Sequence, residues 1–227
     1  LNGTYLITAA DTGLQVTAFG VNMVYDGKSH GINVSVADAS GRAVTGTTTY
    51  YSEQELTDSN YGTGSTQSPV LTDAGSKTVY YYVASDRYAP VSGSKEIVIS
   101  RKTVRVTAND ATITYGDVPA AGGVTYTSFV GKDTAKSLGL SPQYTYSYLQ
   151  YEDAGSYTIT PYGLDESGNY QYSYVSGTLT VAPRPVTFKW TDNSFVYDGT
   201  RKTVSALLKG TVNGVAIGVL TYQENTT

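Results

Sequence analysis

The chain of 227 residues contains no cysteine, only one histidine, one methionine and one tryptophan, and few charged residues. Without cysteine, disulfides, thiolate metal sites and cysteine nucleophiles are excluded. The net charge of −4 predicts no nucleic-acid binding, because phosphates require clustered Lys and Arg. The same charge disfavours an anionic membrane surface. No apolar run approaches the roughly 18 residues that span a bilayer, so we expect no membrane insertion in this fragment.

The sequence also has few groups of residues that could act together in catalysis. His30 lies beside the Asp26-Gly27 turn, and a histidine base would need both a carboxylate to orient it and a nucleophile. Asp165 and Glu166 are a carboxylate pair of the kind that glycoside hydrolysis needs, but they lie in a glycine-flanked loop. We expect solvated loop side chains at these positions and predict that the chain is not an enzyme.

Asp and Asn residues gather in three short segments, Asp58–Asn60, Asn109–Asp110 and Asp192–Asn193. Such oxygens can bind Ca²⁺, but none of the three has the twelve-residue spacing of an EF-hand. We interpret them as turn and capping residues, and expect no metal and no cofactor. Lysines lie mostly beside turns or alternate outward, so we expect no Lys–Asn isopeptide bond either.

What the sequence does have is an internal repeat rich in tyrosine, of which there are 22. The Asp-Ala-Gly-Ser segment at 73–76 recurs at 153–156, and Tyr25 of one turn recurs as Tyr115 and Tyr197. A period of this size indicates tandem domains rather than solenoid layers. We predict a first repeat at 11–100, a second at 101–182 and an incomplete third at 183–227.

The two ends of the chain lead to a further expectation. Residues 1–10 resemble the closing strand of a repeat, and are either the end of a preceding unit or a recruited strand. Because the chain begins at Leu1 without a signal-peptide pattern, we expect a mature fragment of a longer protein. We also expect edge-strand pairing through the incomplete third repeat, either with residues 1–10 or with another chain.

Within the repeats, strands alternate apolar and polar residues, most clearly at Ile32, Val34 and Val36. Residues 53–68 are polar and rich in Gly and Ser, which predicts a long loop. Asp133–Leu138 lies between two glycines and could form one or two helical turns, with Asp133 as the N-cap. The chain is therefore predicted to be mainly β.

Asp153, Gly155 and Tyr157 have the Asp-x-Gly-x-Tyr form of the tyrosine corner of immunoglobulin sandwiches, in which the Tyr hydroxyl bonds back to the upstream backbone. Lys77 replaces this tyrosine in the first repeat. The corner favours tandem Ig-like β-sandwich units. The turn predicted at Asp133–Leu138 favours the alternative, β-grasp-like units with a short helix.

The turn Tyr115-Gly116-Asp117, the corner, Asn169-Tyr170 and the closing strand 177–181 together resemble the MBG repeats, of the Tyr-Gly-x type, of bacterial surface proteins. Tyr25-Asp26-Gly27 and Tyr197-Asp198-Gly199 are similar to related Tyr-Asp-Gly and bacterial Ig-like repeats. The resemblance implies an extracellular, often cell-wall-anchored adhesin or stalk on a bacterial surface. It supplies no catalytic residue.

Alternating tyrosines form two rows, each on one face of a predicted strand. An exposed row can stack on sugars or bind a host protein, since tyrosine offers a large amphipathic surface. A buried row would only wall the core. The leading prediction is a structural stalk; the alternative is an adhesive module that contacts host glycan or protein through the rows Tyr144, Tyr146 and Tyr148, and Tyr170, Tyr172 and Tyr174.

Overall fold

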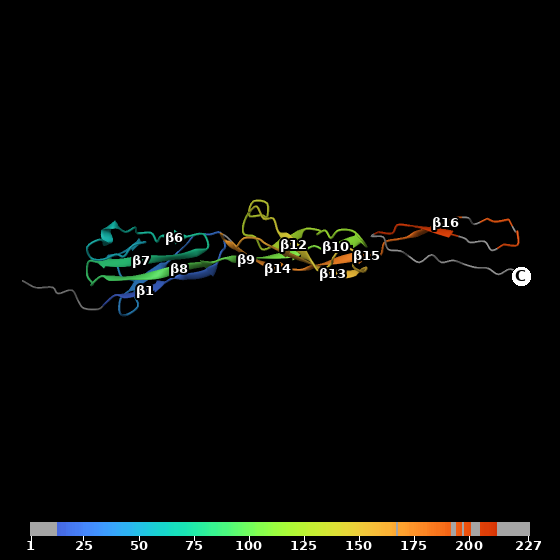
Figure 1. Cartoon of the computed structure of the whole chain (residues 1–227). Helices are drawn as coiled ribbons and strands as arrows, with labels where there is room; N and C mark the ends of the chain where they lie inside the picture. The colour runs from blue at the N-terminus through green and yellow to red at the C-terminus, as the bar shows by residue number, and fades with distance from the viewer. Residues whose placement is uncertain (1–12, 167, 192–193, 197, 201–204, 213–227) are drawn as a thin grey trace, which may run out of the picture. The chain divides into compact units, whose positions relative to one another are not determined.

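The computed structural model describes residues 13–166, 168–191, 194–196, 198–200 and 205–212 (Figure 1). Within these residues the only helix is the three-residue 3-10 helix η1 at Tyr61–Thr63. The mainly β class predicted from the sequence is confirmed.

The strands, in chain order, are β1 Gln15–Phe19, β2 Val21–Val24, β3 His30–Gly31, β4 Asn33–Ala37, β5 Thr47–Ser52, β6 Val70–Leu71, β7 Gly75–Ser85, β8 Val91–Ser100, β9 Lys102–Ala108, β10 Ala111–Thr114, β11 Val124–Thr127, β12 Gln143–Tyr146, β13 Gly155–Tyr162, β14 Tyr170–Val175, β15 Gly177–Ala182, β16 Thr187–Thr191 and β17 Ser205–Lys209.

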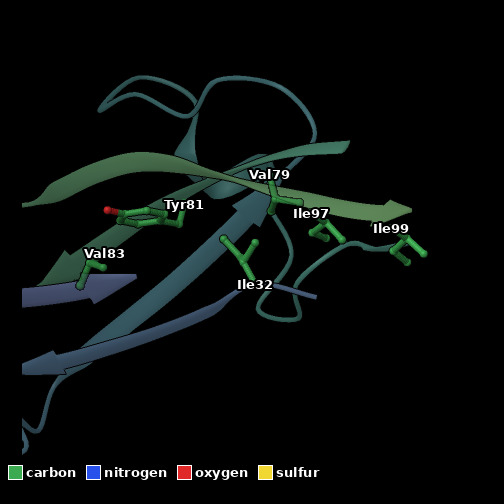
Figure 2. Packing of buried hydrophobic residues seen from close by; sticks show 6 residues of the cluster. All are labelled: Ile32, Val79, Tyr81, Val83, Ile97 and Ile99. Carbon is green, nitrogen blue, oxygen red and sulfur yellow. The ribbon is translucent and has the colours of Figure 1, made fainter. Parts of the chain in front are cut away.

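The first repeat packs a four-stranded sheet of order β2-β8-β7-β5 against the antiparallel pair β1 and β4. Alternate residues of β7 and β8 face the core, because successive side chains of a strand point to opposite faces. Figure 2 shows five of these side chains, together with Ile32. Each fully buried Val or Ile contributes about 1.5–3 kcal/mol of hydrophobic stabilisation. The buried residues of this cluster are Ile32, Val79, Tyr81, Val83, Ile97 and Ile99.

The chain passes from one sheet to the other between β1 and β2. β1 pairs with β4, whereas β2 pairs in parallel with β8. Gly20 lies at this crossing, and a Cβ atom there would lie 2.4 Å from the backbone oxygen of Glu96. Only glycine permits so close an approach of the two backbones.

The second repeat has a four-stranded sheet of the same plan as that of the first, whereas its second sheet has three strands instead of two. Its four-stranded sheet has the order β10-β15-β13-β12, and its second sheet has the order β11-β9-β14. β10 pairs in parallel with β15, as β2 does with β8. In both repeats one further backbone hydrogen bond extends this parallel pairing. The Tyr25 amide donates to Ser100 O, and the Tyr115 amide donates to Ala182 O, each at 2.8 Å.

The core of the second repeat joins residues from both sheets, which makes it a two-layered sandwich. Ala108 comes from β9, while Ile159, Leu179 and Val181 come from β13 and β15. Tyr148, which follows β12, completes the buried cluster. With no helix described at Asp133–Leu138, the β-grasp alternative is wrong: the segment forms turns, with a single bond of helical spacing from the Leu138 amide to Thr134 O at 3.1 Å.

The third repeat contributes the antiparallel pair β16 and β17 to the described residues. This pair corresponds to β1 and β4 of the first repeat. Val186, Phe188 and Trp190 are 41%, 55% and 54% exposed. The predicted closing strand at residues 1–10 and the segment Asp192–Asn193 lie outside the described residues.

The chain forms two compact units that do not coincide with the sequence repeats. The first unit comprises residues 1–104 with 128–138 and 165–172, and the second comprises 105–127, 139–164 and 173–227. Two segments of the second repeat, 128–138 and 165–172, therefore belong to the same compact unit as the first repeat.

Candidate functional site

The row Tyr144, Tyr146 and Tyr148 turns toward the core of the second repeat. Tyr148 is 1% exposed, and the other two are half-buried and pack against the same cluster. Burial raises the pKa of Tyr144 above its ordinary value. These three rings form a wall of the core, which weakens the case for ligand contact by this row.

In the second row, the exposure of the tyrosine side chains increases along β14. Tyr170 is 2% exposed, Tyr172 is half-buried and Tyr174 is 36% exposed. The Tyr174 hydroxyl accepts a 2.8 Å hydrogen bond from the Leu164 amide, which fixes the ring. Ligand contact by the rows stays a prediction, and Tyr174 is the member most open to solvent.

The tyrosine corner of the second repeat has the geometry that its sequence predicts. The Tyr157 hydroxyl donates to Asp153 O at 2.7 Å, and Gly155 begins β13. The Tyr157 ring lies edge-on to Tyr148, with ring centroids 5.0 Å apart. In the first repeat Lys77 occupies the equivalent register position and instead pairs with Glu53.

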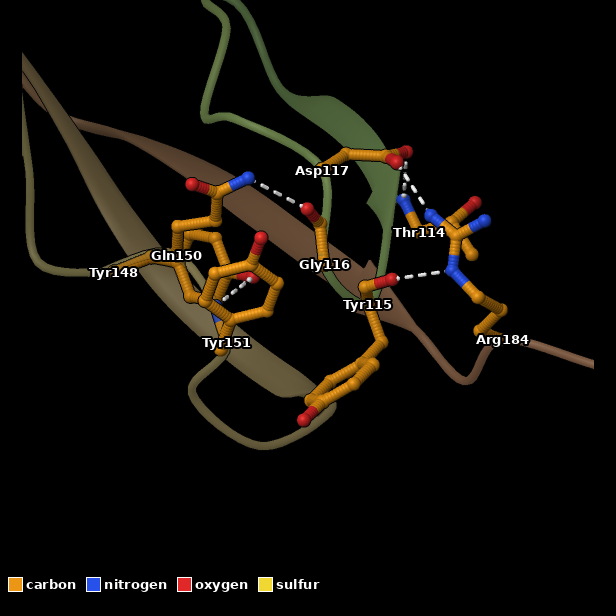
Figure 3. A network of polar contacts seen from close by, with 8 residues as sticks. All are labelled: Thr114, Tyr115, Gly116, Asp117, Tyr148, Gln150, Tyr151 and Arg184. Carbon is orange, nitrogen blue, oxygen red and sulfur yellow. Dashed lines mark hydrogen bonds and ion pairs between the residues drawn. The ribbon is translucent and has the colours of Figure 1, made fainter. Parts of the chain in front are cut away.

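The turn at Tyr115–Asp117 anchors a polar network (Figure 3). The Arg184 guanidinium donates from Nε to Tyr115 O at 2.7 Å and from one terminal nitrogen to Asp117 Oδ1 at 2.6 Å. Gln150 donates to Gly116 O at 2.8 Å from the other side. A bond to a backbone carbonyl and an ion pair together fix the turn.

The turn at Tyr25–Gly27 lies beside Tyr170 in the first compact unit. The two tyrosine rings meet edge to face at 5.7 Å, and Phe129 meets Tyr170 in the same way at 5.6 Å. The Tyr170 hydroxyl donates to Asp133 Oδ2 at 2.6 Å. Burial, and the bond to this carboxylate, raise the pKa of Tyr170 to about 12.

A second tyrosine cluster, not predicted from the sequence, lies under the loop at residues 53–68. Tyr61 stacks on Tyr82 at 4.6 Å, and the buried Tyr82 hydroxyl donates to Asp58 Oδ1 at 2.7 Å. Burial and this bond raise the pKa of Tyr82 to about 12. The run of tyrosines at 80–82 was the available signal, since a strand with aromatics on both faces must be covered on both.

The expectation of a solvated loop side chain is wrong for His30, which begins β3 and is half-buried, whereas Asp165 and Glu166 do lie in a loop. His30 Nε2 lies 2.9 Å from Asp26 Oδ1, and hydrogen bonding to His30 holds the pKa of Asp26 below its usual value. Asp165 and Glu166 are exposed. No nucleophile accompanies His30 in the contacts of the described chain.

The Asp and Asn clusters accept hydrogen bonds from backbone amides, one of them local and one from a distant part of the chain. Asn60 Oδ1 accepts from the Thr57 amide at 2.6 Å, and Asp110 Oδ1 accepts from the Thr178 amide at 2.7 Å. Across the described residues, no three His, Cys, Asp or Glu side chains gather where they could hold a metal ion. In the same residues no helix has the length and apolarity to cross a bilayer.

Comparison with known proteins identifies one segment. Residues 104–180 match the family described as MBG domain (YGX type). This match confirms, for the second repeat, the resemblance carried by its Tyr-Gly turn. No curated protein matches the chain. Extracellular domains 3–5 of Drosophila OTK align with 95% of this chain and 97% of their own length, at 9% identity and a TM-score of 0.24, which is too low to support any inference.

Proposed function

We propose that the chain is a structural stalk segment of an adhesin-like protein, extracellular and anchored to a bacterial cell wall, with no enzymatic activity. The single observation that carries the proposal is the connection between the first two repeats. β8 ends at Ser100 and β9 begins at Lys102, so Arg101 alone lies between two strands. A one-residue connection suits a spacer, because it leaves little length for independent swinging.

The use of the tyrosines supports the same proposal. Tyr144, Tyr146 and Tyr148 supply core surface in a repeat that has few other large apolar residues. A side chain that is packed in the core cannot also contact a ligand unless part of the domain unfolds. The MBG match at 104–180 agrees with a repeat module of a surface protein.

The test is a binding screen with the labelled chain on a glycan array and on mucin-coated surfaces. A stalk segment should give no signal above that of an unrelated cysteine-free protein of similar charge. Saturable binding to one glycan class or to mucin would overturn the proposal.

The alternative, an adhesive module, draws on the exposure of Tyr174. If binding is seen, Tyr174→Ala should abolish it, whereas Tyr162→Ala should not, although Tyr162 is 41% exposed on β13. If both variants lost binding equally, the binding would not depend on the predicted tyrosine row.

A further inference from the structure

The turn at Tyr25–Gly27 receives a side chain from the second repeat. Gly27 has φ +76°, and a Cβ atom at this position would lie 2.9 Å from Val130 Cγ1. Both residues belong to the first compact unit. A larger residue at 27 would strain the backbone and also displace the valine.

Val130 is held at this turn by Tyr170. The Tyr170 hydroxyl accepts a 3.0 Å bond from the Val130 amide and donates to Asp133, so it binds the loop at two points. Its ring contacts Tyr25, the first residue of the turn. The loop at 128–138 is therefore fixed at the turn rather than merely adjacent to it.

A second contact is made by Asn169. Its Oδ1 accepts from the Ala74 amide at 2.7 Å, and its Nδ2 donates to Asp73 Oδ1 at 3.0 Å. Its backbone oxygen accepts from the Lys102 amide at 2.9 Å. One residue thus binds a turn of the first repeat and also the residue that begins β9.

The same arrangement recurs at Tyr115–Asp117. Gly116 has φ +90°, and a Cβ atom there would lie 2.6 Å from Val212 Cγ2. Val212 follows Val130 by 82 residues, the spacing that separates Tyr115 from Tyr197. Two independent turns therefore meet equivalent valines, and at the second turn Arg184 adds the bonds shown in Figure 3.

We propose that the tyrosine-glycine turn of each repeat is a docking surface whose partner is the valine-bearing loop of the following repeat. This inference rests on the proposed stalk function and adds how its joints are held: by the occupied turn, and not by the connecting residues alone. Glycine provides the space, the valine fills it, and polar groups beside the turn hold the two together.

The experiment uses pulsed electron-spin distance measurements, which suit a chain without native cysteine. Nitroxide labels at Ser94→Cys and Ser156→Cys, both exposed strand positions, report on the first and second repeats. The unmodified joint should give a narrow distance distribution. Val130→Asp places a carboxylate in the apolar contact and should roughly double its width.

Val118→Asp is the matched control, because Val118 is 68% exposed. It should leave the distribution unchanged. Asn169→Ala removes the second contact without altering the valine loop, and should broaden the distribution even if Val130→Asp disturbs folding. Circular dichroism checks that both repeats remain folded.

A broad distribution in the unsubstituted chain, or no broadening in either joint variant, would overturn the docking surface. Failure of the stalk function is a separate result: glycan or mucin binding would refute it while leaving a narrow distribution intact. A broad distribution without ligand binding would retain a spacer but refute this joint.

Discussion

The Tyr157 hydroxyl donates a 2.7 Å hydrogen bond to the backbone oxygen of Asp153, four residues earlier. The bond closes the corner that leads into β13. Tyr157→Phe removes the bond and keeps the ring against Tyr148. Because one intramolecular hydrogen bond is lost, the melting temperature of the second repeat should fall by roughly 3–8 °C.

Tyr162→Phe is the control for this prediction, since Tyr162 is 41% exposed at the end of the same strand. It should change the melting temperature little. Equal melting temperatures for Tyr157→Phe and the unsubstituted chain would show that the corner bond contributes nothing to stability.

Gly177 marks a close approach of two backbones in the second repeat. A Cβ atom at this position would lie 2.6 Å from Ala108 O, so Gly177→Ala must push β15 away from β9. We expect a loss of about 1–3 kcal/mol in the free energy of unfolding, measured by denaturant titration. The control Gly62→Ala meets no atom within 4 Å and should stay within about 0.5 kcal/mol.

Stability should fall at high pH because of two tyrosines. Burial and a carboxylate partner raise the pKa of Tyr82 and of Tyr170 to about 12 in the folded chain, against about 10 for an unfolded tyrosine. The folded state therefore favours the protonated phenols. Their contribution is complete below pH of about 10 and is lost as the pH rises toward about 12.

The measurement is denaturant unfolding at several pH values together with the absorbance of tyrosinate. Two or more tyrosines should ionise late in the folded chain, and none should in concentrated denaturant. Tyr82→Phe should flatten part of the fall in stability. An identical pH profile for this variant would remove Tyr82 as a cause.

Trp190, the single tryptophan, reports on the third repeat. Its side chain is 54% exposed on β16. Edge pairing of this repeat stays a prediction; if two copies pair there, tryptophan emission should shift to shorter wavelength as concentration rises. Sedimentation should show a dimer over the same range, and Lys209→Pro, at the end of β17, should weaken it.

Constant emission and a monomer at every concentration would refute the pairing. Thr187, the register partner of Lys209, is less suitable for the proline substitution. Thr187 lies on β16, the strand that carries the reporter Trp190.

Much of the fold was predictable because it depends on neighbours in sequence. The strand alternation at Ile32, Val34 and Val36 requires only a period of two, and the corner joins residues four positions apart. The loop at 53–68 was also predicted from its polar residues, although the structure has the short 3-10 helix η1 within it. At Asp133–Leu138 the structure has turns with one bond of helical spacing and no helix, and the Asp133 carboxylate accepts a bond from Tyr170.

The candidate site was less predictable. A row such as Tyr144, Tyr146 and Tyr148 must lie on one face of a strand, but alternation does not say which face is inward. That choice depends on what packs against the strand. Here the core between the two sheets of the second repeat is filled in part by the Tyr148 side chain.

The sequence by itself determined the repeat, its β class, the absence of thiol chemistry and the corner, because each follows from residue type or from spacing over a few positions. Only the tertiary structure decided how the turns are used. Asn169 binds Ala74 across 95 residues, and Val130 reaches Gly27 from another repeat. Such contacts arise when folded surfaces meet, and no local pattern encodes their partner.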